Sequence, residues 1–212
     1  MHLQAVRNKF KRKFTQCRIF RDYRKNRYID KDRNAIIILG EYHPKHNKSY
    51  EVMDNFSKKI LLLKKEQISQ PQYHFYKEAV NYFSFRLHLM LSCKTRFVIC
   101  GYPTSQKGYA GRGITQIIKN LCRYSVNRID GSNVLMRRLT VPKKSQGGER
   151  NYEKEIETLC VTRKSLVQNQ QVLLIDDITT TGVSLRAGKQ VLLRAGAKLV
   201  AMLALGKTVY AG

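Results

Sequence analysis

The chain has 212 residues, 42% of them hydrophobic, which is enough for one α/β domain with a small appendage. No apolar stretch approaches the length of a membrane span, and no apolar signal core stands at the N-terminus. We therefore expect a soluble, cytoplasmic protein with no membrane span. The net charge of +25 excludes a balanced surface and indicates a polyanionic partner. Nucleic acid explains this excess better than one small phosphorylated substrate; the alternative is a basic surface that aids solubility.

The five cysteines are scattered along the chain, and none forms a Cys-x-x-Cys pair. Their odd number and spacing argue against a disulfide framework or a zinc finger and fit a reducing compartment. They are Cys17, Cys93, Cys100, Cys122 and Cys160.

Residues 1–33 form a basic, aromatic-rich N-terminal segment with twelve Lys and Arg and three acidic residues. Val6, Phe10, Phe14 and Cys17 repeat at helical spacing, which predicts a basic amphipathic helix. We expect the aromatic stripe to pack on the domain and the charges to bind single-stranded DNA or RNA, whose phosphates they would pair. A charged face turned to water and a targeting helix are the alternatives, and the lack of serine speaks against the latter. The residues assigned to nucleic acid are Lys9, Lys11, Arg12, Lys13, Arg18, Arg21, Arg24 and Lys25.

Residues 34–95 are expected to form a hood-like, mainly helical region. A short apolar run predicts a strand over 35–39, and periodic segments predict helices over 52–63 and 73–91. On the longer helix, the residues expected to face the core are Phe75, Ala79, Tyr82, Phe83 and Leu89.

Residues 96–212 alternate between apolar runs and helical patterns, with a polar loop over 143–150. This alternation predicts an α/β core in which helices flank a parallel sheet. Strands are expected over 96–100, 134–139, 172–175 and 198–205, and helices over 114–125, 152–159 and 184–195.

The most informative segment is the thirteen-residue stretch 172–184, Val-Leu-Leu-Ile-Asp-Asp-Ile-Thr-Thr-Thr-Gly-Val-Ser. Its apolar run predicts a strand buried on both faces. Asp176 and Asp177 would then lie at the carboxyl end of that strand, where open α/β sheets bind ligands, as acceptors for vicinal sugar hydroxyls. The following turn can present backbone N–H groups, hydroxyls and a helix N-terminus to a phosphate.

A second loop of interest follows the strand expected over 96–100. It contains small and hydroxyl residues and one lysine, which is typical of a diphosphate cradle. Because its strand precedes the motif strand in a parallel sheet, we expect both loops to open at the same edge. Its candidate ligands are Thr104, Ser105, Gln106 and Lys107.

Residues 172–184 resemble the phosphoribosyl-pyrophosphate (PRPP) motif of type I phosphoribosyltransferases. Over about residues 95–206 the chain resembles one branch of these proteins, the competence protein F family. The similar segments are Arg112-Gly113-Ile114-Thr115-Gln116, Leu135-Met136-Arg137, Gln146 with Arg150, and Ala195-Gly196-Ala197. Ile114-Thr115 replaces the Phe-Asn pair of the family, the spacing from Gln146 to Arg150 is short, and the N-terminal zinc finger of the family is missing.

The resemblance implies a site for PRPP and Mg²⁺. Asp176 and Asp177 would hold the ribose hydroxyls, directly or through the waters of the metal, while Thr104 to Lys107 would bind the diphosphate. Arg137, Lys143, Lys144 or Arg150 would close over the diphosphate, although ordinary surface charge explains Lys143 and Lys144 equally well. The residues implied for the 5′-phosphate are Thr179, Thr180, Thr181, Gly182, Val183 and Ser184.

Two functions follow. The first is an enzyme that transfers a phosphoribosyl group from PRPP to a nitrogenous acceptor through an oxocarbenium-like transition state stabilised by positioned charge. The second is a non-catalytic nucleic-acid-binding module that senses PRPP, a nucleotide or a 5′-phosphate, because the competence protein F family is linked to the handling of single-stranded DNA. The excess positive charge favours a nucleic-acid role in both. A homo-oligomer or a protein partner and the identity of the acceptor base stay open.

Overall fold

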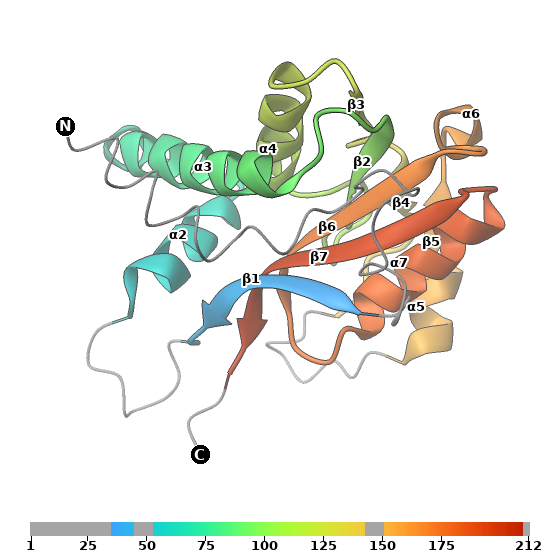
Figure 1. Cartoon of the computed structure of the whole chain (residues 1–212). Helices are drawn as coiled ribbons and strands as arrows, with labels where there is room; N and C mark the ends of the chain where they lie inside the picture. Colours follow the sequence, from blue (N-terminus) through green and yellow to red (C-terminus); the bar gives the residue numbers. More distant parts are fainter. Residues whose placement is uncertain (1–34, 45–52, 143–150, 210–212) are drawn as a thin grey trace.

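The computed structural model describes residues 35–44, 53–142 and 151–209 (Figure 1). The predicted basic segment 1–33 lies outside these ranges, as do Lys143, Lys144, Gln146 and Arg150. The strands are β1 (Ile36–Tyr42), β2 (Phe97–Gly101), β3 (Arg128–Asp130), β4 (Leu135–Arg137), β5 (Leu159–Val161), β6 (Gln171–Thr179) and β7 (Leu199–Thr208). The helices are α2 (Asn55–Leu63), α3 (Gln70–Met90), α4 (Arg112–Arg123), α5 (Tyr152–Thr158), α6 (Lys164–Val167) and α7 (Val183–Arg194). Over the described ranges, no helix combines the length and the apolar character that crossing a membrane requires.

Five strands form one sheet in the order β1-β7-β6-β2-β3, and each neighbouring pair is parallel. The predicted α/β class with a parallel sheet between helices is therefore confirmed. The motif strand β6 lies at the centre and is longer than the predicted 172–175. It continues through both acids to Thr179 because β7 keeps pairing with it, from Gln171 opposite Leu199 to Thr179 opposite Lys207.

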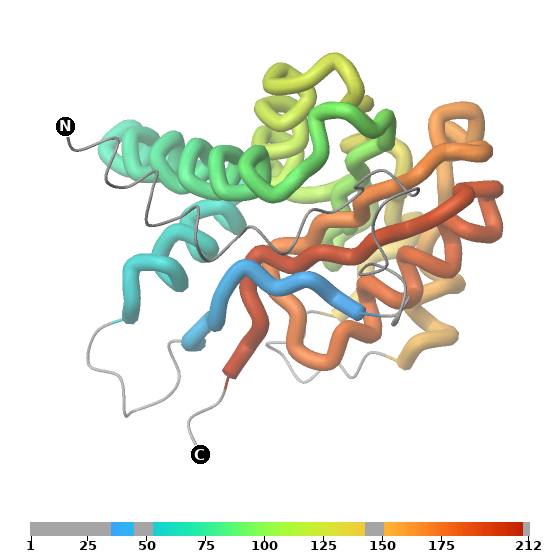
Figure 2. The backbone as a smooth tube through the Cα atoms, viewed as in Figure 1, coloured from blue at the N-terminus to red at the C-terminus, as the bar shows by residue number. Residues whose placement is uncertain are grey.

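The strand predicted over 35–39 belongs to this sheet. β1 pairs in parallel with β7, with Ile36 opposite Met202 and Tyr42 opposite Thr208. Figure 2 shows β1 running beside β7, although the two strands lie far apart in the sequence. Residues 34–95 thus supply an edge strand as well as the helices α2 and α3.

Helices cover both faces of the sheet. On one face, α2, α3 and α4 pack on Leu173 and Ile175 of β6, and on the other face α7 packs on Val172 and Leu174. Alternation of side chains across the strand divides the apolar run between two hydrophobic clusters. This division explains why all four residues of the run are fully buried.

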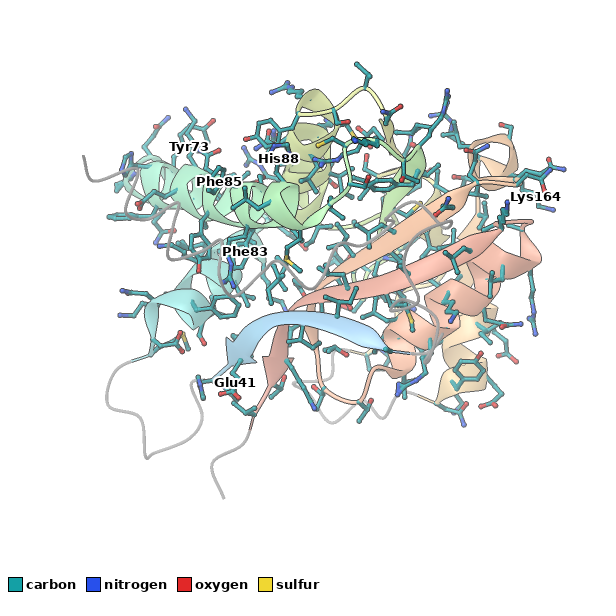
Figure 3. The ribbon with its side chains drawn as sticks, in the orientation of Figure 1. Glu41, Tyr73, Phe83, Phe85, His88 and Lys164 are labelled. Atoms are coloured by element: carbon teal, nitrogen blue, oxygen red, sulfur yellow. The ribbon has the colours of Figure 1, made fainter. Side chains whose placement is uncertain are left out.

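Two expectations about side chains and strands are wrong. On α3, Phe75 and Leu89 are 56% and 50% exposed, because the helix turns a stripe that includes Tyr76, Val80 and Leu87 inward instead. Figure 3 shows Tyr73 on the outer side of α3 and Phe83, which is buried as predicted, on the inner side.

The strand expected over 134–139 is shorter and lies outside the main sheet. As β4 it pairs antiparallel with β5 in a separate two-stranded sheet. The partner strand β5 begins at Leu159, directly after α5, and three residues carry too little pattern for a sequence-based prediction.

The packing of α4 against the end of α2 depends on Gly113. A Cβ added there would lie 2.5 Å from Leu63 O. We expect Gly113→Ala to lower the free energy of unfolding by about 1–3 kcal/mol through overpacking, although alanine normally stabilises a helix interior. Chemical denaturation measures this change. The control is Gly111→Ala, where the nearest atom is 3.4 Å away; equal stability of the two variants would contradict the prediction.

Candidate functional site

The paired acids lie near the end of β6, half-buried at the carboxyl edge of the sheet. Each carboxylate is oriented by the backbone amide that follows it. Asp176 Oδ1 accepts from Asp177 N–H at 2.8 Å, and Asp177 Oδ1 accepts from Ile178 N–H at 2.6 Å. These bonds hold the two carboxylates at defined positions on the strand.

The two acids have different neighbours. Asp177 Oδ2 lies 3.6 Å from Lys64 Nζ, which is at the end of α2, and both side chains are partly exposed. Tyr42 is close by: burial raises the pKa of its phenol, Lys64 opposes this and Asp177 adds to it. The negative charge of Asp176 instead adds, after burial and other groups, to the raised pKa of Tyr102. The acids therefore address opposite sides of the strand.

Lys64 and Tyr42 were not among the sequence-predicted site residues. Lys64 stands after a helix and Tyr42 at the end of β1, so neither is near the motif in the sequence. Pairing of β1 with β7 brings Tyr42 to the edge and packing of α2 on the sheet brings Lys64 there, and no local signal pairs either with Asp177.

A tight turn of residues 180–182, called the glycine turn below, follows β6 and leads into α7. Gly182 has φ of 81°, the left-handed region that favours glycine, and is the residue at which the helix begins. The turn is braced by Arg186, whose Nη1 donates to Thr181 O at 2.7 Å, and by Thr180, whose hydroxyl donates to Thr208 Oγ1 at 3.2 Å. The predicted turn with a helix N-terminus behind it is present in the structure, and its role in binding phosphate stays a prediction.

A cavity of about 280 Å³ lies between this turn and β1. Residues 179–182 form one wall, and Ile36 and Ile38 of β1 form another. Arg186 and Lys207 add two exposed cations, neither of which was a sequence-predicted site residue. Hydroxyls, backbone and two cations around one space suit a phosphate group. Of the two, only Arg186, two residues beyond the motif, had a local signal.

The second predicted loop leaves the sheet beside the acids. β2 pairs with β6, with Gly101 opposite Ile175, and Tyr102 N–H donates to Ile175 O at 2.8 Å. Both loops thus open at the same edge, as predicted. Within the second loop, Thr104 and Ser105 are half-buried, whereas Gln106 and Lys107 are exposed. Their ligand roles stay predictions.

Arg137 does not lie at the ligand edge. Its side chain is fully buried and pairs with Glu155, Nη1 to Oε2 at 2.9 Å. Its Nε donates to Thr104 O at 2.7 Å from beneath the loop that follows β2. This placement corrects the prediction that Arg137 contacts the diphosphate, because its guanidinium already has protein partners.

The hydroxyl of Ser184 is also turned inward. It is buried and donates to Glu155 Oε1 at 3.3 Å. The contribution of Ser184 to a phosphate site would therefore come from its backbone N–H at the start of α7 rather than from its hydroxyl.

The donor set suits Mg²⁺ that arrives with a substrate. The residues that the structure describes contain no group of three or more His, Cys, Asp or Glu able to hold a metal. Mg²⁺ is usually held by one or two carboxylates together with substrate phosphates and waters. Asp176 and Asp177 supply such carboxylates at the edge.

Known proteins offer distant likenesses. No family model and no characterised protein sequence matches the chain. One similar structure is titled as the allosteric regulatory enzyme of purine biosynthesis, with 16% identity, a TM-score of 0.37 and coverage of 59% of this chain. The chain spans only 24% of that protein. Another is a hypoxanthine phosphoribosyltransferase from Staphylococcus aureus, with 14% identity, a TM-score of 0.38, and coverage of 71% of this chain and 80% of that one. The fold class rests on the sheet order of this chain itself.

The geometry of the glycine turn depends on Gly182. An added Cβ would overlap Ile36 Cδ1 and also force a non-glycine residue to φ of 81°. We expect Gly182→Ala to destabilise the fold by more than Gly196→Ala, whose φ is 97° but whose nearest atom would be 3.5 Å away. The control should cost about 1–2 kcal/mol for backbone strain, and Gly182→Ala about 0.5–1.5 kcal/mol more, because the ends of the Ile36 and Arg186 side chains must shift to make room. Equal unfolding free energies in denaturant titrations would show that the turn is not packed against β1.

Proposed function

We propose that this protein is phosphoribosyltransferase-like and binds PRPP, or a nucleotide, together with Mg²⁺. One observation carries the proposal: the paired acids of β6, the glycine turn before α7 and the loop after β2 all meet at one edge of a parallel sheet. Crevices at the carboxyl ends of such strands are where open α/β sheets bind ligands. The proposal agrees with the resemblance to the competence protein F family.

Each part of the edge suits one part of PRPP. The ribose hydroxyls would donate to Asp176 and Asp177, with Lys64 giving up or sharing its contact with Asp177. The 5′-phosphate would occupy the glycine turn, where α7 supplies N–H groups and Arg186 and Lys207 supply positive charge. The diphosphate would lie against residues 104–107, which we call the diphosphate loop. Mg²⁺ would neutralise part of its charge when bound.

The chemistry supported by these residues is transfer of the phosphoribosyl group to a nitrogenous base. Loss of diphosphate leaves an oxocarbenium-like ribose, which positioned negative charge stabilises. In this arrangement Asp176 and Asp177 would be the carboxylates beside that ribose. Such a reaction requires no protein nucleophile, so the site needs only to orient the two reactants and hold charge.

The test is calorimetric titration of the full chain with PRPP and Mg²⁺. We expect Asp176→Asn and Asp177→Asn each to weaken binding by about tenfold or more, because hydrogen bonds to charged groups are lost. Glu157→Gln, which alters an exposed acid on α5, is the control and should bind like the wild type. Absence of PRPP binding to the wild type would overturn the proposal.

Catalysis is tested separately by diphosphate release with a panel of purine and pyrimidine bases. Release that is lost in Asp176→Asn supports the transferase. PRPP binding without release from any base would instead support the second candidate, a non-catalytic module that senses PRPP, a nucleotide or a 5′-phosphate.

The net charge of +25 favours action beside nucleic acid in either case. We include in the proposal that single-stranded DNA or RNA binds this protein and that the basic residues of segment 1–33 contribute most of the affinity. One small phosphorylated ligand does not require 40 Lys and Arg. A role of the DNA-uptake or DNA-processing type would follow.

This part of the proposal predicts a steep dependence on salt. If about six phosphates are neutralised, affinity for single-stranded DNA should fall by about 10³-fold between 50 and 200 mM salt. Fluorescence anisotropy of a labelled oligonucleotide measures the slope. Deletion of residues 1–33 should remove most of it, with PRPP titration as the control for folding. Weak or salt-insensitive binding by the full chain would contradict a nucleic-acid role.

A further inference from the structure

A buried polar cluster lies beneath the proposed PRPP site. Its centre is the ion pair between Arg137 of β4 and Glu155 of α5, whose side chains are 0% and 3% exposed. Moving two charges out of water is costly, and a buried pair often stabilises a fold no more than apolar residues of the same size. The pair therefore invites an explanation other than stability.

One carboxylate of the cluster is bonded to both ligand loops. Glu155 Oε2 accepts from the phenol of Tyr102 at 2.8 Å, and Glu155 Oε1 accepts from the hydroxyl of Ser184 at 3.3 Å. Tyr102 begins the loop after β2, and Ser184 lies in the first turn of α7, directly after the glycine turn. Burial, followed by the charge of Glu155, raises the pKa of Tyr102 above its usual value, so the phenol remains a donor at neutral pH. Arg137 Nη2 also donates to Tyr102, at 3.2 Å.

Arg137 in addition sets the direction of one peptide group in the diphosphate loop. Its Nε donates to Thr104 O at 2.7 Å, which turns this carbonyl inward. The peptide bonds of the described residues are trans, so the C=O and N–H of one peptide group point in opposite directions. The N–H of Ser105 consequently points away from Arg137 and from the buried cluster.

We propose that Arg137 and Glu155 are positioning residues that hold the diphosphate loop at a fixed separation from the N-terminus of α7, and so select ligands carrying phosphate groups at both ends of one pentose. This inference rests on the proposed function. Neither side chain touches the ligand; both act through Thr104, Tyr102 and Ser184. A fixed separation matters for PRPP, which would span both loops, and not for ribose 5-phosphate, which would occupy only the glycine turn.

The decisive variant is Arg137→Met/Glu155→Met, which removes both charges together and leaves none buried alone. We expect it to unfold cooperatively but at a lower temperature than the wild type, because the buried hydroxyls of Tyr102 and Ser184 lose Glu155 as their acceptor. Its affinity for PRPP should fall by about tenfold or more, while its affinity for ribose 5-phosphate changes by less than about twofold. Titrations of both ligands with Mg²⁺ give the ratio of the affinity for PRPP to the affinity for ribose 5-phosphate. A general loss of structure would lower both affinities and leave this ratio unchanged.

The chain offers a matched control in Arg128, a second buried arginine. Its guanidinium donates to Leu121 O at 3.3 Å and Leu91 O at 3.1 Å, both outside the ligand loops. Arg128→Met should leave the preference for PRPP over ribose 5-phosphate unchanged. If the double variant does not fold, Tyr102→Phe removes the two hydrogen bonds that the Tyr102 hydroxyl makes with Glu155 and Arg137 but no charge, and should lower the preference by several-fold.

Amide hydrogen exchange of the ligand-free protein tests the positioning role separately from the proposed function. In the double variant, exchange should accelerate in residues 104–107 and 180–184 together, and Arg128→Met should not reproduce this pattern. Failure of the wild type to bind either ligand would overturn the proposed function alone. Unchanged exchange in both segments, or an unchanged preference for PRPP, would overturn the positioning role.

Discussion

The structure depends on the parallel pairing of β6 with two neighbours at once. β2 on one side and β7 on the other satisfy its backbone, and helices cover both of its faces. A strand enclosed in this way can be entirely apolar from Val172 to Ile175 and then carry Asp176 and Asp177 in its last residues, near the carboxyl edge of the sheet. The strand is therefore a rigid support for two charges, and everything proposed for ligand binding is measured from it.

Around this support the protein arranges polar groups in two depths. At the surface, Lys64, Arg186 and Lys207 are exposed and can reach a ligand. Beneath them, Arg137 and Glu155 are removed from water and bonded to the backs of the loops. The exposed charges stay hydrated, and water screens their electrostatic interactions until a ligand covers them. The buried charges have a large desolvation penalty, and their hydrogen bonds fix the direction of their partners. The same kinds of side chain thus serve attraction in one layer and alignment in the other.

The sequence was most informative where structure is local. The motif 172–184 combines strand, acids and turn in one stretch, so its strand, turn and helix could be predicted together. Features set by distant pairing could not be predicted. The length of β6 depends on β7, and the burial of Arg137 on β4 depends on Glu155 in a different element, α5. The inner face of α3 likewise depends on α2 and α4, which turned Phe75 outward. The sequence also does not indicate which charged side chains are buried, because an arginine that contacts a ligand and an arginine inside the protein are the same residue in a sequence.

The pairing of β1 with β7 has a consequence for the order in which the protein is assembled. Ile36 meets Met202, so β1 leaves the ribosome long before its partner has been synthesised. Until then the backbone groups of β1 lack the strand with which they pair, and Ile36 and Ile38 lack the opposite side of the cavity that they line. The glycine turn, which packs on Ile36, acquires its final support only at that late stage. A nascent chain would therefore lack the finished edge to which ligand binding is assigned in the proposed function until β7 has been synthesised.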